Sequence, residues 1–286
     1  MEITSREFLE YIKETKGSSI NTILAYQSDL SQLTEVMTRE LQREPTPADI
    51  QNNTIQAYTD WLSKQGYRPA TVARKIAAVR SYIDYLVRFN IIQNPDVDQY
   101  LQVEAAPRRK PRILSREEIE RLLGSPLIKR TPRNLRDAAI LAVLFKTGLR
   151  AADLVGLQMA DLDMELGVII RHQPESNLKL GESRTILEEY LMEGRPHLAR
   201  HPDEFAVFLN QRGRQLSRQG LWLIVKRWAK KAMLGDDVSP HTLRHTLAYT
   251  LLQEGQSRKV VQDILGLSSP NSIRVLSKLD EEEETK

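Results

Sequence analysis

The sequence contains no cysteine, and this absence excludes disulfide bonds, thiolate catalysis and cysteine-ligated metal sites. It also contains no run of about 18 apolar residues, the length that a transmembrane helix needs, so we expect a cytoplasmic protein without a membrane partner. We find no metal-ligand cluster and no phosphate-binding glycine loop, and therefore expect no metal and no cofactor. No tyrosine follows Tyr249, so the C-terminal part of the chain offers no phenolic oxygen as a nucleophile.

The charge of the chain is unevenly distributed. The net charge is only +3, but the acidic run from Asp280 to Glu284 offsets basic residues elsewhere. The rest of the chain is therefore distinctly basic. A basic body favours a polyanionic partner such as nucleic acid.

Residues 1–103 have the pattern of a small helical domain. Apolar residues recur at helical spacing, for example at Ile76, Val79 and Ile83. We expect four or five short helices and no strand. Residues 104–112 form a linker, because Pro107 and Pro111 oppose helix and four cations lie in the same stretch. This linker is either a solvated hinge or a basic strap that follows a phosphate backbone.

Residues 113–286 form the second domain, which is mainly helical. A capping-box pattern at Ser115 and Glu118 begins one helix. Further helices are expected at about 135–146, 217–232, 242–254 and 258–265. Residues 168–170 and 184–187 have the composition of short strands around the polar turn 175–182, so we expect a small antiparallel sheet.

Four residues of the second domain have the chemistry of a phosphate-binding catalytic site. They are Arg150, Lys179, His241 and Arg244. Arginine binds two phosphate oxygens with its planar fork, while lysine or histidine can protonate a leaving oxygen. Taken singly, each has an ordinary structural alternative: a surface ion pair for an arginine, a solvated lysine on a mobile hairpin, or a satisfied core histidine.

The order and spacing of these motifs resemble the tyrosine recombinase family, which contains phage integrases and Xer-type recombinases. Residues 147–154, Thr-Gly-Leu-Arg-Ala-Ala-Asp-Leu, resemble its first arginine box, and residues 239–246, Ser-Pro-His-Thr-Leu-Arg-His-Thr, resemble the second. Residues 136–141 and 262–266 resemble the segments that precede the first and third boxes. In the first domain the resemblance rests on Thr22, Tyr26, Asp29, Leu30, Thr71, Arg74, Asn94 and Pro95.

The resemblance implies a mainly α, two-domain DNA clamp. It would consist of a helical, SAM-like core-binding domain and a catalytic-type domain with a small antiparallel sheet. Arg150 and Arg244 would hold the non-bridging oxygens of the scissile phosphate, and Lys179 would protonate the leaving 5′ oxygen. His241 would assist proton movement. Asp153 matches the acidic position of the family, although a carboxylate in a first helical turn is also stabilised by the helix dipole.

Two positions depart from the family pattern. Leu267 stands where the third box has His or Trp, and Leu276 stands where the family has its nucleophilic tyrosine. Leucine cannot form the phosphotyrosyl intermediate that covalent strand cleavage requires. Ser272 and Ser277 lie nearby, but neither has an evident activating base.

The sequence therefore predicts a DNA-binding protein of the tyrosine recombinase fold that is defective in strand cleavage, a pseudoenzyme. Its partners would be duplex DNA and a second copy or a recombinase partner on that DNA. One alternative is an active recombinase or integrase that uses a displaced nucleophile or an active partner. Another is a protein-interaction module that no longer binds DNA.

Overall fold

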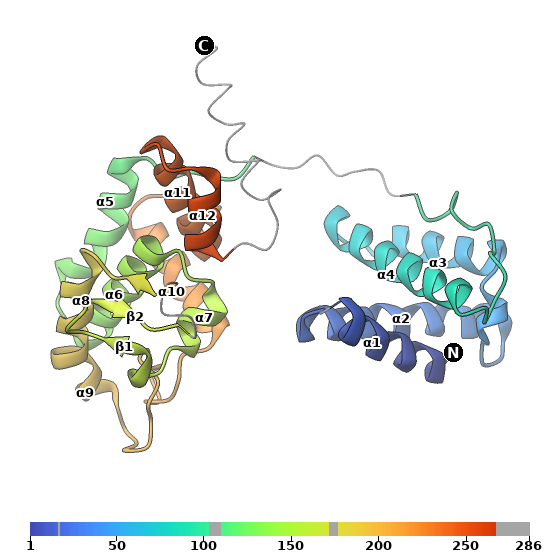
Figure 1. The fold of residues 1–286 in the computed structure, drawn as a ribbon, viewed down its shortest axis with the longest axis horizontal. Coiled ribbons are helices and arrows are strands. Elements are labelled where there is room, and N and C mark those ends of the chain that lie inside the picture. Colours follow the sequence, from blue (N-terminus) through green and yellow to red (C-terminus); the bar gives the residue numbers. More distant parts are fainter. Residues whose placement is uncertain (17, 103–109, 172–176, 267–286) are drawn as a thin grey trace, which may run out of the picture. The chain divides into compact units, whose positions relative to one another are not determined.

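The computed structural model describes residues 1–16, 18–102, 110–171 and 177–266. The chain divides into two compact units, Met1–Arg109 and Lys110–Lys286, and each unit is described by itself (Figure 1). Most of the expected linker, the acidic tail, Leu267 and Leu276 lie outside the described residues.

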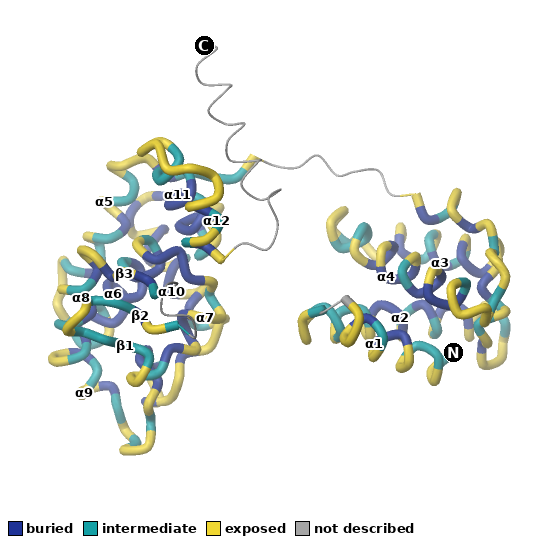
Figure 2. Tube along the Cα trace, viewed as in Figure 1, coloured by how far each residue is buried: buried dark blue, intermediate teal, exposed yellow. Residues whose placement is uncertain are grey.

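The described part of the first unit, residues 1–16 and 18–102, contains four helices: α1 (Glu2–Lys16), α2 (Ile20–Leu41), α3 (Asn52–Lys64) and α4 (Pro69–Arg88), with a 3-10 turn at Pro47–Asp49. Its described residues contain no strand, as the apolar spacing predicts. The Ser19 hydroxyl accepts a hydrogen bond from the Thr22 amide and so caps α2. The core contains the fully buried rings of Phe8, Tyr58 and Tyr82. Figure 2 shows buried stretches along each of the four helices of this unit.

A buried carboxylate joins α2 to α4 in the first unit. Asp29 is fully buried and accepts a hydrogen bond from Lys75 Nζ at 2.9 Å and another from Arg74. Lys75 Nζ also donates to Gln32 Oε1 at 2.5 Å. A buried charge is tolerated only when it is paired and hydrogen-bonded in this way.

The second unit contains most of the chain's helices. They are α5 (Arg116–Gly124), α6 (Pro132–Thr147), α7 (Ala151–Gly156), α8 (Ser183–Glu189), α9 (Arg195–Leu198), α10 (Arg218–Lys231), α11 (Pro240–Gln253) and α12 (Arg258–Leu265), with 3-10 turns at Ser125–Ile128 and Met159–Asp161 and a π-helical turn at Tyr190–Gly194. The most buried of these is α6, whose Ala139, Ile140 and Leu141 are completely enclosed.

Buried Asp137 fixes α6 against α10. Its carboxylate accepts hydrogen bonds from Arg136 Nη2 at 2.7 Å, from Trp228 Nε1 at 2.8 Å and from Arg227. Arg136 in turn donates to the carbonyl of Leu209. The buried charges of Asp137 and Arg136 are therefore paired inside the core, where an unpaired charge would be strongly unfavourable.

The small antiparallel sheet has three strands: β1 (Leu162–Asp163), β2 (Val168–Ile169) and β3 (Leu178–Lys179), in the order β1-β2-β3. Leu162 pairs with Ile169, and Ile169 pairs with Leu178.

The expected strand at 184–187 is wrong, because these residues belong to α8. Ser183, Leu187 and Tyr190 are buried at intervals of four and three residues, which is helical rather than alternating spacing. As a consequence, Lys179 lies on strand β3 and not in the turn that precedes a strand.

Candidate nucleic-acid-binding site

Gly148 sets the position of Arg150. Gly148, whose φ of 60° is left-handed, is the C-cap residue of α6, and Arg150 is the N-cap residue of α7. A Cβ placed on Gly148 would lie 2.3 Å from Leu265 Cδ2 and 2.9 Å from Leu247 Cδ2. Glycine is therefore required both for the turn and for the close approach of α11 and α12.

Helix α11 carries His241 and Arg244. Ser239 caps it by accepting from the Thr242 amide, and Pro240 stands in its first turn, where a missing N–H costs nothing. Arg244 is only 6% exposed, whereas His241 lies at the surface. The buried Thr246 hydroxyl accepts from the Leu114 amide, which fixes the start of the second unit against the same helix.

The two arginines meet at the C-terminal end of α12. Arg244 donates through Nη2 to the Leu265 carbonyl at 2.5 Å and through Nη1 to the Gly148 carbonyl. Arg150 donates through Nη2 to the Gly266 carbonyl at 2.6 Å. Because Leu265 and Gly266 are adjacent, the structure brings both guanidinium groups to one place.

The electrostatics of this place favour an anion. Burial, followed by the charge of Arg150, lowers the pKa of Arg244 to about 10, so its guanidinium remains charged near neutral pH. The pKa of His241 is lowered mainly because neighbouring protein atoms displace water from the ring, and further by the charges of Arg244 and Arg150. Its ring centroid lies 5.1 Å from that of His245, whose pKa is lowered for the same main reason. A negatively charged group would relieve this mutual repulsion of cations.

An open hollow of about 580 Å³ lies beside the arginines. It is lined by Leu149, Arg150, Asp153, Leu157, Asp161, Ile169, Ile170, Arg171, Leu265 and Gly266. Arg171 was not identified from the sequence. The available signal was a cation directly after the apolar run 168–170, but its significance depends on where the sheet lies in the fold.

Of the residues selected from the sequence, Arg150 and Asp153 line this hollow, whereas Arg244, His241 and Lys179 do not. Lys179 is exposed on β3, where its backbone pairs with Val168. The structure thus brings Arg150, Arg244, His241 and Asp153 together and leaves Lys179 on the neighbouring strand.

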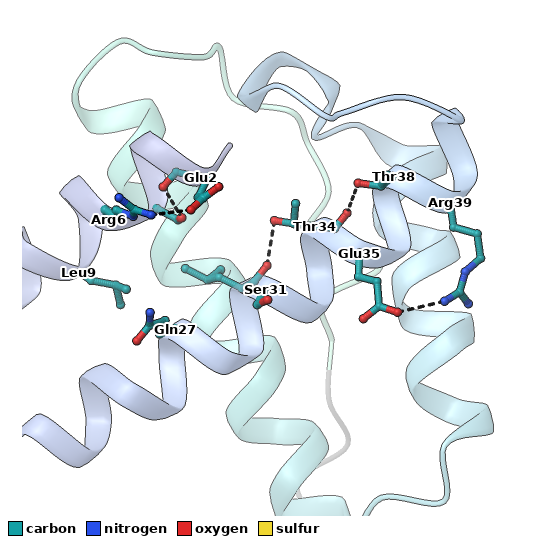
Figure 3. A pocket seen from close by; sticks show the side chains of 11 residues that line it. Glu2, Arg6, Leu9, Gln27, Ser31, Thr34, Glu35, Thr38 and Arg39 are labelled. Atoms are coloured by element: carbon teal, nitrogen blue, oxygen red, sulfur yellow. Dashed lines mark hydrogen bonds and ion pairs between the residues drawn. The ribbon is translucent and has the colours of Figure 1, made fainter.

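A second hollow lies in the first unit. A groove between α1 and α2 carries charged groups that pair with each other, Arg6 with Glu2 and Arg39 with Glu35 (Figure 3). Among the described residues, no group of three or more His, Asp or Glu side chains could hold a metal ion. No described helix is both long and apolar enough to cross a membrane.

Comparison with known families identifies both units. Residues 112–283 match the phage integrase family, and residues 6–90 match the phage integrase N-terminal SAM-like domain. The chain is 34% identical to the tyrosine recombinase XerC of Herpetosiphon aurantiacus, over 94% of this chain and 88% of that protein. It is 38% identical to the tyrosine recombinase XerD of Listeria innocua, over 91% of this chain and 88% of that protein.

Solved structures share the fold at lower identity. The post-cleavage complex of the XerH site-specific recombinase bound to palindromic difH substrate has a TM-score of 0.73 at 22% identity, covering 98% of this chain and 82% of that chain. The lambda integrase dimer bound to a COC' core site has a TM-score of 0.68 at 15% identity, covering 96% and 94%. With matching models for both units and relatives above 30% identity over almost the whole chain, the protein belongs to the phage integrase family of tyrosine recombinases.

Proposed function

We propose that this chain binds duplex DNA through its second unit without cleaving it by the usual tyrosine route. The convergence of Arg150 and Arg244 at the C-terminal end of α12, beside the hollow that Arg150 lines, supports the binding half of this proposal. Leu276 at the family's nucleophile position supports the other half, because a hydrocarbon side chain cannot attack phosphorus.

The four selected residues have different roles in this proposal. Arg150 and Arg244 bind the non-bridging oxygens of one phosphate, and His241, with its depressed pKa, accepts or relays a proton. Lys179 contacts a phosphate from β3. The role of proton donor has less geometric support for Lys179, since the residue is exposed on a strand and does not line the hollow.

The relatives indicate which partners to test. XerH is bound to a palindromic difH substrate in its structure, and lambda integrase is a dimer bound to a COC' core site. We propose duplex DNA as the principal partner, together with a second copy of this chain or an active recombinase on the same DNA. A cytoplasmic, DNA-associated location follows from that proposal.

The main alternative is an active recombinase. It is favoured by the retention of Arg150, His241 and Arg244 in a chain whose relatives are named tyrosine recombinases. This alternative needs either a displaced nucleophile in the chain or an active partner that supplies one. A protein-interaction module is a weaker alternative, because it gives the arginine pair no ligand.

One experiment separates the three functions. Genomic fragments bound by the purified chain are selected, and the recovered site is rebuilt as a nicked suicide substrate that traps covalent intermediates. We expect binding that weakens steeply with salt, because cations on the protein release counterions from DNA, and we expect no covalent adduct. A robust adduct mapped to any residue by mass spectrometry would establish the recombinase alternative, and a lack of binding at low salt would establish the interaction module.

A further inference from the structure

Arg171 is held in place by the sheet beside the hollow. It lies two residues after the end of β2, a strand that pairs with both β1 and β3. Its backbone N–H donates to Asn177 Oδ1 at 2.9 Å, and the N–H of the preceding residue, Ile170, donates to the Asp161 carbonyl at 2.8 Å. The backbone that carries this arginine is therefore fixed from both sides, and the side chain starts from a defined point.

The side chain of Arg171 extends to the place where the other two arginines meet. It lines the same hollow as Arg150. Its Nη1 lies 3.8 Å from the position that a Cβ would have on Gly266, the residue whose carbonyl accepts from Arg150. The charge of Arg171 is also among the causes that lower the pKa of Arg244. Three guanidinium groups from three separate elements thus surround the end of α12.

Arg171 has no carboxylate partner among the described residues, unlike the half-buried Arg112 and Arg184 of the same unit. Among residues 110–171 and 177–266, no carboxylate lies within ion-pair distance of its guanidinium. Arg184 by contrast pairs with Glu188 at 2.7 Å, and Arg112 pairs with Glu118 at 2.5 Å. A half-buried cation without a counterion, turned toward two others, is unfavourable unless an anion enters.

The carboxylates of the hollow do not remove this excess of positive charge. Asp161 Oδ2 accepts from the Gln158 amide at 2.8 Å and so is used to cap the turn that precedes β1. Asp153 is exposed in the first turn of α7. Three guanidinium groups, those of Arg150, Arg171 and Arg244, face two carboxylates, which leaves a net positive site.

We propose that Arg171 is a third phosphate-binding residue that acts with Arg150 and Arg244 on a single DNA phosphate. This inference rests on the proposed function, since it presumes that the chain binds duplex DNA. Asn177 is a positioning residue, because it holds the backbone of Arg171 rather than the ligand. An arginine keeps its proton at neutral pH, so Arg171 strengthens binding without acting as a proton donor.

The test compares Arg171→Gln with Arg184→Gln in the full chain. Arg184 also follows this small sheet and contacts Gly167, at the other end of β2, but it is paired with Glu188. A dye-labelled duplex of mixed sequence serves as the probe, and fluorescence anisotropy gives Kd over a salt series. We expect Arg171→Gln to weaken binding about tenfold, or about 1.4 kcal/mol, and to reduce the salt slope by about 0.9. Arg184→Gln should change neither, and Arg171→Lys should recover part of the loss.

The double variant Arg150→Gln with Arg171→Gln tests whether one phosphate is shared. Residues that bind one group are coupled, so the combined loss should be smaller than the sum of the single losses. Full additivity, or an Arg171→Gln variant that binds like Arg184→Gln, overturns the inference while leaving DNA binding intact. Failure of the unaltered chain to bind the duplex at low salt instead overturns the proposed function and this inference with it. Thermal melting of each variant confirms that a loss of binding is not a loss of folding.

Discussion

Gly148→Ala offers the sharpest test of how the arginine site is built. The left-handed backbone at this position costs a residue with a Cβ about 1–2 kcal/mol. The added methyl group would also overlap Leu265 Cδ2 and Leu247 Cδ2, at 2.3 and 2.9 Å. Both leucines are buried in one apolar cluster with Ala248 and Val261, so rotating them moves the overlap to other buried atoms. Overpacking of this kind costs about 1–3 kcal/mol.

The expected total is a loss of about 2–5 kcal/mol in the stability of the second unit. Urea denaturation of the full chain measures it, with Trp61 replaced by Phe so that the fluorescence comes from Trp222 and Trp228. Gly255→Ala is the matched control, because Gly255 also has a positive φ but nothing lies within 4 Å of its added Cβ. That control should lose only about 1–2 kcal/mol. Equal losses for the two variants would refute the packing argument and leave backbone conformation as the sole role of Gly148.

Three further predictions concern the core, the histidines and the missing nucleophile. Asp137→Asn should destabilise the second unit by about 3 kcal/mol, because it leaves the buried Arg136 charge without its counterion. Urea unfolding measures this loss, with Glu120→Gln, which removes an exposed ion pair, as the control. A loss of stability no larger than that of the control would contradict the prediction. The pKa values of His241 and His245 are lower in the folded protein than in the unfolded chain, where the pKa of histidine is about 6.5. The contribution of the two neutral histidines to the free energy of unfolding is therefore complete above about pH 6.5 and is lost as the pH falls through their folded-state pKa values. Melting temperatures measured from about pH 7 downward should therefore decline less in a His241→Gln, His245→Gln variant than in the unaltered chain. Parallel curves of melting temperature against pH for the two proteins would show that these histidines do not cause the decline. Leu276→Tyr should give little adduct with a suicide substrate, and adding Leu267→His should give more; no adduct from the double variant would show that other parts of the cleavage site are also lost.

The elements with strong helical periodicity could be predicted from the sequence, and the short strands could not. Residues 258–265 were expected to be helical and form α12 as Arg258–Leu265. Strands of two residues carry too little alternation to be recognised. The composition of residues 184–187, with the β-branched Thr185 and Ile186, predicts a strand, whereas the burial of Leu187 and Tyr190 that shows a helix depends on the packed fold.

The residues of the candidate site could likewise be predicted from the sequence only in part. Arg150, His241 and Arg244 could be selected because their local motifs are distinctive, and the structure places them near one another. Their function in binding phosphate stays a prediction. The acceptors of Arg150 and Arg244 are backbone carbonyls, which leave no mark in a sequence. Arg171 was missed because its value depends on the register of β2 and on the position of Gly266, both properties of the tertiary structure.

The hydrogen bonds of Arg244 have a consequence for the entropy of ligand binding. An arginine side chain has five N–H donors, and Arg244 uses Nη1 and Nη2 to hold two carbonyls, which immobilises it before any ligand arrives. Ordering a free arginine side chain opposes binding by up to about 2 kcal/mol. For Arg244 this ordering has already occurred during folding, while Arg171 is anchored, among the residues that the structure describes, only by its backbone. The site thus combines a rigid guanidinium, which defines where an anion must sit, with an adjustable one, which can follow anions of slightly different geometry.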